Sequence, residues 1–137
     1  MKQLFKISLI ALTMAASSYA VADQFDGLTC AGKKEAIQTQ LDYAQKANNT
    51  YRAQGLQKAL DDVNTYCTNE SLEEKYKDKV EDKLENLQDK QEDLQEAQLK
   101  GDPQKIAKRE SKVKAAEYEL KEAQDQLDAF YKALKAQ

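Results

Sequence analysis

The chain has 137 residues, of which 41% are hydrophobic and 33% are charged, and it contains four glycines, one proline, two cysteines and no histidine. The absence of histidine excludes Ser-His and Cys-His nucleophilic catalysis and imidazole ligation of a metal. So few glycines and prolines disfavour a turn-rich β-sandwich, whereas the abundance of Ala, Glu, Lys, Gln and Leu favours long helices. We therefore expect an all-α fold.

The first 22 residues have the organisation of a cleavable export signal. Lys2 and Lys6 provide a positive start, residues 7–16 form a short apolar run, and Ala20-Val21-Ala22 supplies the small residues that a signal peptidase requires. Cleavage is predicted after Ala22, with Ala20 as the alternative, and the mature chain is expected in a bacterial periplasm. The apolar run is too short to span a hydrocarbon core of about 30 Å, so an N-terminal membrane anchor is the weaker interpretation.

Cys30 and Cys67 are the only cysteines of the chain, and in an exported protein a disulfide between them is the leading assignment. A zinc site would need carboxylates or a second chain to complete its ligands, and a redox pair would normally show Cys-x-x-Cys spacing, so both are weaker alternatives. A disulfide would close a loop of about 38 residues and stabilise the fold by about 4 kcal/mol.

Residues 23–69 are predicted to form a disulfide-stapled hairpin of two helices. Apolar residues recur at helical spacing on both sides of Asn48-Asn49-Thr50, which is expected to be a turn with a capping residue. The expected apolar faces comprise Ile37, Leu41, Ala44, Leu56, Ala59, Leu60, Val63 and Tyr66. Cys30 would precede the first helix and Cys67 would end the second, which brings them together in an antiparallel hairpin. For Gly55, inside the second helix, a closely packed neighbouring backbone is the expected compensation for its cost of about 1 kcal/mol.

Residues 70–137 are predicted to form a long antiparallel helical hairpin that resembles a coiled coil. Ser71 and Glu74 form a capping box at the start of its first helix, which should run to about Leu99. The apolar positions of that helix are Leu72, Tyr76, Val80, Leu84, Leu87 and Leu94. The triplet Gly101-Asp102-Pro103 then combines a helix end, an N-cap and a first helical residue.

The final helix has a seven-residue apolar repeat, which predicts a seam against the helix before it. The repeat comprises Ile106, Val113, Leu120, Leu127 and Leu134, and the positions three residues further on are Arg109, Ala116, Ala123 and Phe130. The mostly small residues of the second set would permit close approach of the two helices.

The two long helices carry opposite charge on either side of Gly101, so folding there would place acidic residues across from basic ones. The acidic set is Glu85, Asp89, Glu92, Asp93 and Glu96, and the basic set is Lys105, Lys108, Arg109, Lys112 and Lys114. Most of these charges are expected on solvated faces of the hairpin. The alternative is that the basic set receives an anionic partner.

The sequence contains no Asp-x-Asp-x-Asp-Gly calcium loop, no Walker-type loop and no Gly-x-Ser-x-Gly motif. We therefore expect a non-enzymatic protein with no cofactor and no metal. Loss of Lys2 and Lys6 with the signal would shift the net charge from −3 to −5, which argues against general nucleic-acid or anionic-membrane binding. Four tyrosines are expected to pack with a polar tip rather than form a ligand cage. They are Tyr43, Tyr51, Tyr66 and Tyr76.

Two sets of residues together carry the resemblance of this chain to a known family. The first set is Cys30-Ala31, Lys33, Ile37, Gln40-Leu41, Ala44, Asn49, Arg52, Gly55-Leu56, Ala59-Leu60, Val63, Cys67 and Leu72. The second is Leu94-x-x-Ala97, Gly101-Asp102, Lys105-Ile106, Lys108-Arg109, Lys112, Ala115, Glu119-Leu120 and Ala123. With both sets, the chain resembles the YqjC-like family of small exported proteins from Gram-negative bacteria. The resemblance covers nearly all of the mature chain and implies a periplasmic location and a helical fold, without an established activity. Val113 and Gln57 depart from the pattern, where Leu and Glu are usual.

The leading hypothesis is a protein-interaction, stress-accessory or chaperone-like factor that contacts protein partners. Two groups of residues are the candidates for this contact. They are Asn49, Arg52, Gly55 and Leu56 in the first hairpin, and Lys105, Lys108, Arg109 and Lys112 in the second. The alternatives are a homodimer built on the final heptad seam, and a periplasmic protein that binds a small ligand or cation through its acidic helix.

Overall fold

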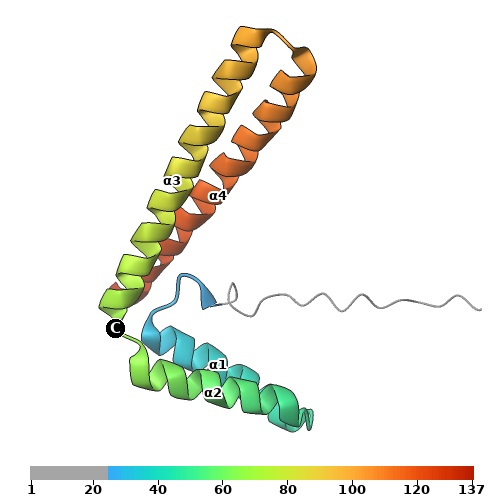
Figure 1. Cartoon of the computed structure of the whole chain (residues 1–137). Coiled ribbons are helices and arrows are strands. Elements are labelled where there is room, and N and C mark those ends of the chain that lie inside the picture. Colours follow the sequence, from blue (N-terminus) through green and yellow to red (C-terminus); the bar gives the residue numbers. More distant parts are fainter. Residues whose placement is uncertain (1–24) are drawn as a thin grey trace, which may run out of the picture.

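The computed structural model describes residues 25–137, and the predicted signal and its cleavage site lie outside this range. The described residues form four helices and no strand, which confirms the all-α prediction (Figure 1). The helices are α1 (Cys30–Lys46), α2 (Thr50–Tyr66), α3 (Asn69–Lys100) and α4 (Pro103–Lys135). Among them, none is both long and apolar enough to cross a membrane.

The head hairpin consists of α1 and α2, which pack against each other along one apolar face. Its buried core comprises Ile37, Leu41, Ala44 and Leu56, all predicted from helical spacing. The Thr29 hydroxyl accepts a hydrogen bond from the Gly32 N–H and caps α1, and the Asn49 side chain caps α2 in the same way by accepting from Arg52. The prediction that Tyr66 belongs to the apolar face is wrong, because 77% of its surface is exposed.

The predicted disulfide joins Cys30 to Cys67, whose Cα atoms are 5.8 Å apart. Cys30 is the first residue of α1 rather than a residue before it, and Cys67 is the C-cap of α2. The Cys30 N–H also donates a 3.0 Å hydrogen bond to the Asn69 side chain at the start of α3. The disulfide therefore lies where the head meets the rest of the chain.

The long hairpin consists of α3 and α4, which run side by side away from the head (Figure 1). Its buried side chains are Tyr76, Ala97, Val113, Ala116, Ala123 and Phe130. Four of these belong to the predicted seam of α4, so this seam packs against α3. The sequence places Leu84 on the apolar face of α3, but 45% of its surface is exposed.

The ends of the two long helices are set by local hydrogen bonds. Gly101 has a positive φ of 72° and ends α3. The Asp102 carboxylate accepts hydrogen bonds from two N–H groups in the first turn of α4, which begins at Pro103. The predicted start of α3 is wrong: its N-cap is Thr68, whose hydroxyl accepts from the Ser71 N–H. Ser71 is thus inside the helix, because Thr68 provides an equivalent hydroxyl three residues earlier.

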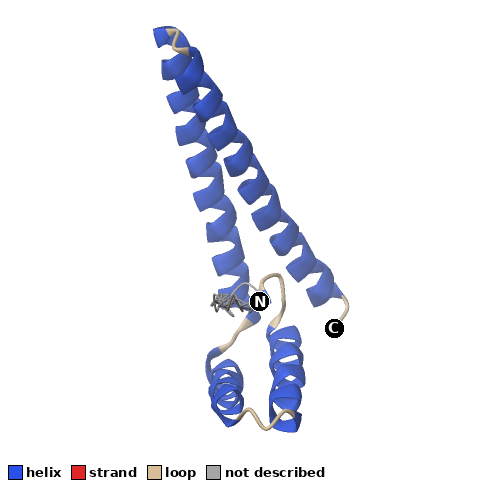
Figure 2. Ribbon diagram, turned by 90° about the vertical axis from the view of Figure 1, so that its right-hand side faces the viewer, coloured by secondary structure: helices blue, strands red, loops and turns tan. Residues whose placement is uncertain are grey.

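A bridging segment of residues 25–29 lies between the two hairpins (Figure 2). Phe25 packs against the head core, and Asp26 forms a 2.7 Å ion pair with Lys79 of α3. Gly27, at φ +78°, lies against the Gln126 backbone of α4, where a Cβ would approach the carbonyl oxygen to 3.2 Å. The segment therefore contacts the head and both long helices within three consecutive residues.

Candidate functional site

The head hairpin carries an open groove of about 610 Å³. Most of its lining comes from exposed and partly buried residues of α2, with one residue from α1 and one from the bridging segment. This head groove is lined by Phe25, Gln40, Tyr51, Arg52, Gln54, Gly55, Leu56, Lys58 and Ala59. No acidic side chain is among these residues, so the groove combines apolar walls with two cationic groups.

The position of each charge in the head groove follows from the cap and the register of α2. The Arg52 N–H donates to the Asn49 side chain in the helix cap, and this fixes the first turn from which the guanidinium extends. That guanidinium donates a 3.3 Å hydrogen bond to the Gln40 amide oxygen of α1. The Lys58 ammonium is paired at 2.7 Å with the Asp62 carboxylate one turn further along α2. Arg52 is therefore bonded to a neutral side chain, whereas Lys58 is bonded to a carboxylate.

Three of the four residues singled out in the first hairpin line this groove. Among them, Arg52 and Gly55 are exposed, whereas Leu56 is buried, with 6% of its surface exposed. Asn49 is not among the lining residues, and its side chain is used in the cap of α2. These three candidates therefore lie together in one groove, and the fourth, Asn49, positions Arg52 through the helix cap.

Gly55 lies in the middle of α2 without a neighbour that requires a glycine. No heavy atom outside its own helix backbone lies within 4 Å of the place where a Cβ would stand. The expected close packing of another backbone against Gly55 is therefore wrong for the described part of the chain. An interior helical glycine costs about 1 kcal/mol relative to alanine, and no contact within residues 25–137 offsets that cost at Gly55.

The prediction that the tyrosines pack into the fold holds for Tyr76 alone. Tyr43 is 70% exposed, Tyr51 is 90% exposed and Tyr66 is 77% exposed. Of these, Tyr51 forms part of the groove, and Phe25 is a second groove residue that sequence reasoning missed. The exposure of Tyr51 could have been predicted from its position in the helical repeat. Tyr51 lies four residues before Gly55 and hence on the same side of α2, away from the side of the buried Leu56.

The second candidate group lies at the far end of the long hairpin, where Lys105, Lys108, Arg109 and Lys112 line a groove of about 330 Å³. This tip groove also contains Asp93, Glu96, Ala97 and Lys100. Arg109 forms an ion pair with Asp93, one of the predicted contacts between α3 and α4, and Lys100 forms one with Glu96. Part of the positive charge is therefore compensated within the groove.

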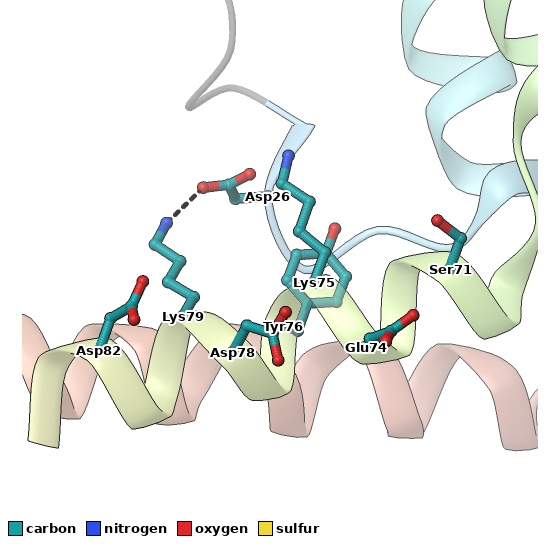
Figure 3. Close-up of a pocket in the computed structure, with 8 residues that line it drawn as sticks. All are labelled: Asp26, Ser71, Glu74, Lys75, Tyr76, Asp78, Lys79 and Asp82. Carbon is teal, nitrogen blue, oxygen red and sulfur yellow. Dashed lines mark hydrogen bonds and ion pairs between the residues drawn. The ribbon is translucent and has the colours of Figure 1, made fainter.

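A third hollow, of about 590 Å³, lies where the bridging segment crosses α3 (Figure 3). The dashed contact is the ion pair between Asp26 and Lys79, and the Tyr76 ring lies beneath the segment. Burial raises the pKa of Tyr76, and the nearby Asp26 carboxylate raises it further. The residues that line this junction hollow are Asp26, Ser71, Glu74, Lys75, Tyr76, Asp78, Lys79 and Asp82.

The junction hollow is chiefly a place where charges are matched between segments. Lys33 of α1 is half-buried nearby, and burial lowers the pKa of its ammonium group, as does the proximity of Lys75, whereas Asp26 opposes the shift. Over residues 25–137, no group of three or more carboxylate or cysteine side chains is placed to hold a metal ion. Among these three hollows, the head groove is the one that combines a predominantly apolar lining with a helical glycine, Gly55, for which no neighbouring residue gives a packing reason.

Comparison with known proteins places the chain among proteins without an assigned role. A family model described as "Protein of unknown function (DUF1090)" matches residues 12–122. No curated protein matches the chain, and no solved structure matches it. The matched range includes the head groove and most of the long hairpin.

Proposed function

Because the chain belongs to this family of unknown function, we propose a function from the features of its surface. We propose that it is a non-enzymatic periplasmic protein that binds a protein partner through the head groove. It would act as an accessory, stress-related or chaperone-like factor of the cell envelope. The resemblance to the YqjC-like family is part of this proposal.

Two observations support a location in the periplasm. The first 22 residues have the charge, apolar run and small residues of an export signal. Cys30 and Cys67 are joined in a disulfide, and structural disulfides persist in oxidising compartments such as the periplasm.

A role without catalysis is supported by the lack of a free thiol and of a histidine that could activate a hydroxyl group. The only two thiols of the chain are consumed in the disulfide, and the chain has no histidine to activate a hydroxyl group. Binding to a partner needs neither group.

The observation that carries the proposal is the composition of the head groove. Tyr51, Phe25 and Ala59 provide apolar surface, and Arg52 provides a planar donor beside it. Aromatic residues and arginine are the residue types most enriched in protein interfaces. Most residues that line the groove belong to α2, and no heavy atom outside the helix's own backbone lies within 4 Å of the place of a Cβ at Gly55, which leaves space for a partner helix to approach α2 closely.

Photo-crosslinking in intact cells tests this function. Tyr51 would be replaced by p-benzoylphenylalanine, which retains an aromatic ring at a position that is 90% exposed. The matched control is the same replacement at Tyr118 of α4, which is 70% exposed and is not among the residues that line the head groove. We expect a discrete protein adduct from position 51 that is absent from position 118. The absence of an adduct from position 51, or identical adducts from both positions, would contradict the proposal.

A further inference from the structure

We propose that the partner of the head groove is a second copy of this chain, whose α2 packs antiparallel against the first α2 so that two heads form a four-helix bundle. This inference rests on the proposed function of the groove and adds the identity of its occupant. It uses a different surface from the homodimer expected on the α4 seam, whose residues Val113, Ala116, Ala123 and Phe130 are buried in the long hairpin.

The head by itself offers only one layer of packing. Its core has four buried side chains, and the apolar residues around them remain only partly buried. These residues are Phe25, Ala53, Ala59, Leu60 and Val63. A two-helix hairpin must bury its remaining apolar surface against another element, and a four-helix bundle is a common solution for helices of this length.

The exposed side of α2 has the pattern of a close helix contact. Tyr51, Gly55, Ala59, Asp62 and Tyr66 follow one face, since each lies three or four residues after the one before it. The two small residues lie in the centre, where helix backbones would approach most closely, and the two exposed tyrosines lie at the ends. A backbone contact from the second copy would also explain why a glycine stands at position 55, since no contact within the described residues requires one there.

The charges of this face are complementary to a second copy of the same face. In an antiparallel pair centred on residue 57, Gly55 faces Ala59 of the second copy, and Arg52 faces Asp62 of the second copy. In both pairs the two residues are equally far from residue 57 along the helix. A twofold axis at residue 57 therefore produces each contact twice, as an isologous interface requires. Arg52 is bonded to the neutral Gln40, and the Asp62 side chain is 52% exposed despite its contact with Lys58. Both groups therefore have room for the intermolecular pair.

The charged residues of the proposed bundle distinguish between possible occupants of the groove, whereas the apolar residues that line the groove do not. An unrelated helix would satisfy Phe25 and Tyr51 equally well, but it would have to supply its own carboxylate at the position of Asp62. A second copy supplies that carboxylate by symmetry, and its own Arg52 is satisfied in the same contact. Charge complementarity thus favours self-association over an unrelated partner.

Sedimentation velocity with charge reversals tests the inference on the full processed chain with its disulfide intact. We expect the wild type to sediment as a dimer at high micromolar concentration. Arg52→Asp or Asp62→Arg alone would place like charges across the interface twice and weaken the dimer by about a hundredfold. An equimolar mixture of the two single variants would restore the dimer, because each chain then supplies the charge that the other lacks.

A steric pair of variants tests the same interface without changing charge. Gly55→Leu would block close approach and give a monomer, whereas Asn64→Leu would leave the dimer intact. Asn64 is exposed and lies nine residues from Gly55, which is about two and a half helical turns and hence the opposite side of α2. Circular dichroism of each variant would establish that α2 is still formed.

Three results would overturn the second copy as occupant. They are a monomeric wild type, a dimer that neither charge reversal weakens, and a mixture of the two reversals that stays monomeric. If one of these results accompanies a position-51 adduct with a different protein, the groove remains the binding surface and only its occupant is wrong. If no adduct forms from position 51, the proposed function fails as well.

Discussion

The Tyr76 hydroxyl donates a 3.1 Å hydrogen bond to the carbonyl oxygen of Leu28, which links α3 to the bridging segment. The Tyr76 side chain is buried, and its ring centroid lies 5.2 Å from that of Phe130 in α4. One residue therefore holds α3, α4 and the segment that leads into the head. Because α1 begins at Cys30, shortly after Leu28, this bond helps to hold the head against the long hairpin.

Replacement of Tyr76 by phenylalanine would remove the bond and keep the ring contact with Phe130. We expect the free energy of unfolding to fall by about 0.5–1.5 kcal/mol, because the Leu28 carbonyl loses its donor. Urea denaturation measures this change. Tyr118→Phe is the control, since Tyr118 is 70% exposed, and an equal loss in both variants would contradict the role given to Tyr76.

Two glycines should respond to alanine with opposite signs. Gly101→Ala should lower the free energy of unfolding by about 1–2 kcal/mol, because its φ of 72° is a left-handed conformation. Gly55→Ala should raise it by about 0.5–1 kcal/mol, because α2 is regular there and the added methyl meets nothing. Thermal denaturation at low protein concentration measures both changes. A loss of stability in Gly55→Ala would show that the monomer itself requires this glycine.

The Cys30–Cys67 disulfide should stabilise the head more than any single contact within it. The two cysteines are 37 residues apart, and loop-closure entropy predicts a contribution of about 4 kcal/mol. The double variant Cys30→Ser, Cys67→Ser should therefore unfold its head at a much lower urea concentration, while α3 and α4 persist. Hydrogen exchange resolved along the chain distinguishes the two hairpins. Equal protection of α1 and α2 with and without the disulfide would contradict this prediction.

Stability should decline at both ends of the pH range. A hydrogen bond from Lys77 lowers the pKa of Glu73, and one from Lys83 lowers the pKa of Glu119, each from the ordinary value of 4.5. Their contributions are present above the unfolded pKa and are lost as the pH falls through the lowered, folded pKa. Burial raises the pKa of Tyr76 above its ordinary value of 10.0, so its contribution is present below that pH and is lost as the pH rises through the folded pKa.

The midpoint of thermal unfolding, measured against pH, would show these two declines. Glu119→Gln should reduce the slope of the acid decline, because the variant cannot take up a proton at this position. Tyr76→Phe should reduce the slope of the alkaline decline, because the variant has no hydroxyl proton to lose. A pH dependence that neither variant changes would contradict the assignment.

Features that depend on neighbouring residues were predictable from the sequence. The break at Gly101-Asp102-Pro103 was predicted residue by residue, because each residue acts on the backbone next to it. The seam of α4 was also predicted, because a seven-residue repeat selects one side of a helix whatever the partner. The pairing of Cys30 with Cys67 followed from their positions at two ends of one hairpin.

Features that depend on distant residues were not predictable in this way. The bridging segment has no periodicity, and its place is set by Lys79, Tyr76 and Gln126, which lie far along the chain. The start of α3 was missed because Thr68 and Ser71 are both good caps, and local sequence does not decide between them. Gly55 was expected to pack against a neighbouring backbone, which the described residues do not supply, because a glycine in a helix does not reveal whether such a neighbour belongs to the same chain or to another molecule.

The claim that the head groove is the binding surface is tested most directly by the photo-crosslink from position 51 in cells whose chain also carries the substitution Gly55→Leu. We predict that the adduct formed by the chain with Gly55 disappears in the Gly55→Leu variant. No heavy atom outside the helix's own backbone lies within 4 Å of the place of a Cβ at residue 55, so the leucine side chain would occupy space that the partner needs for close contact with α2. An adduct of unchanged identity and yield, from a variant that retains its helical content, would contradict the account.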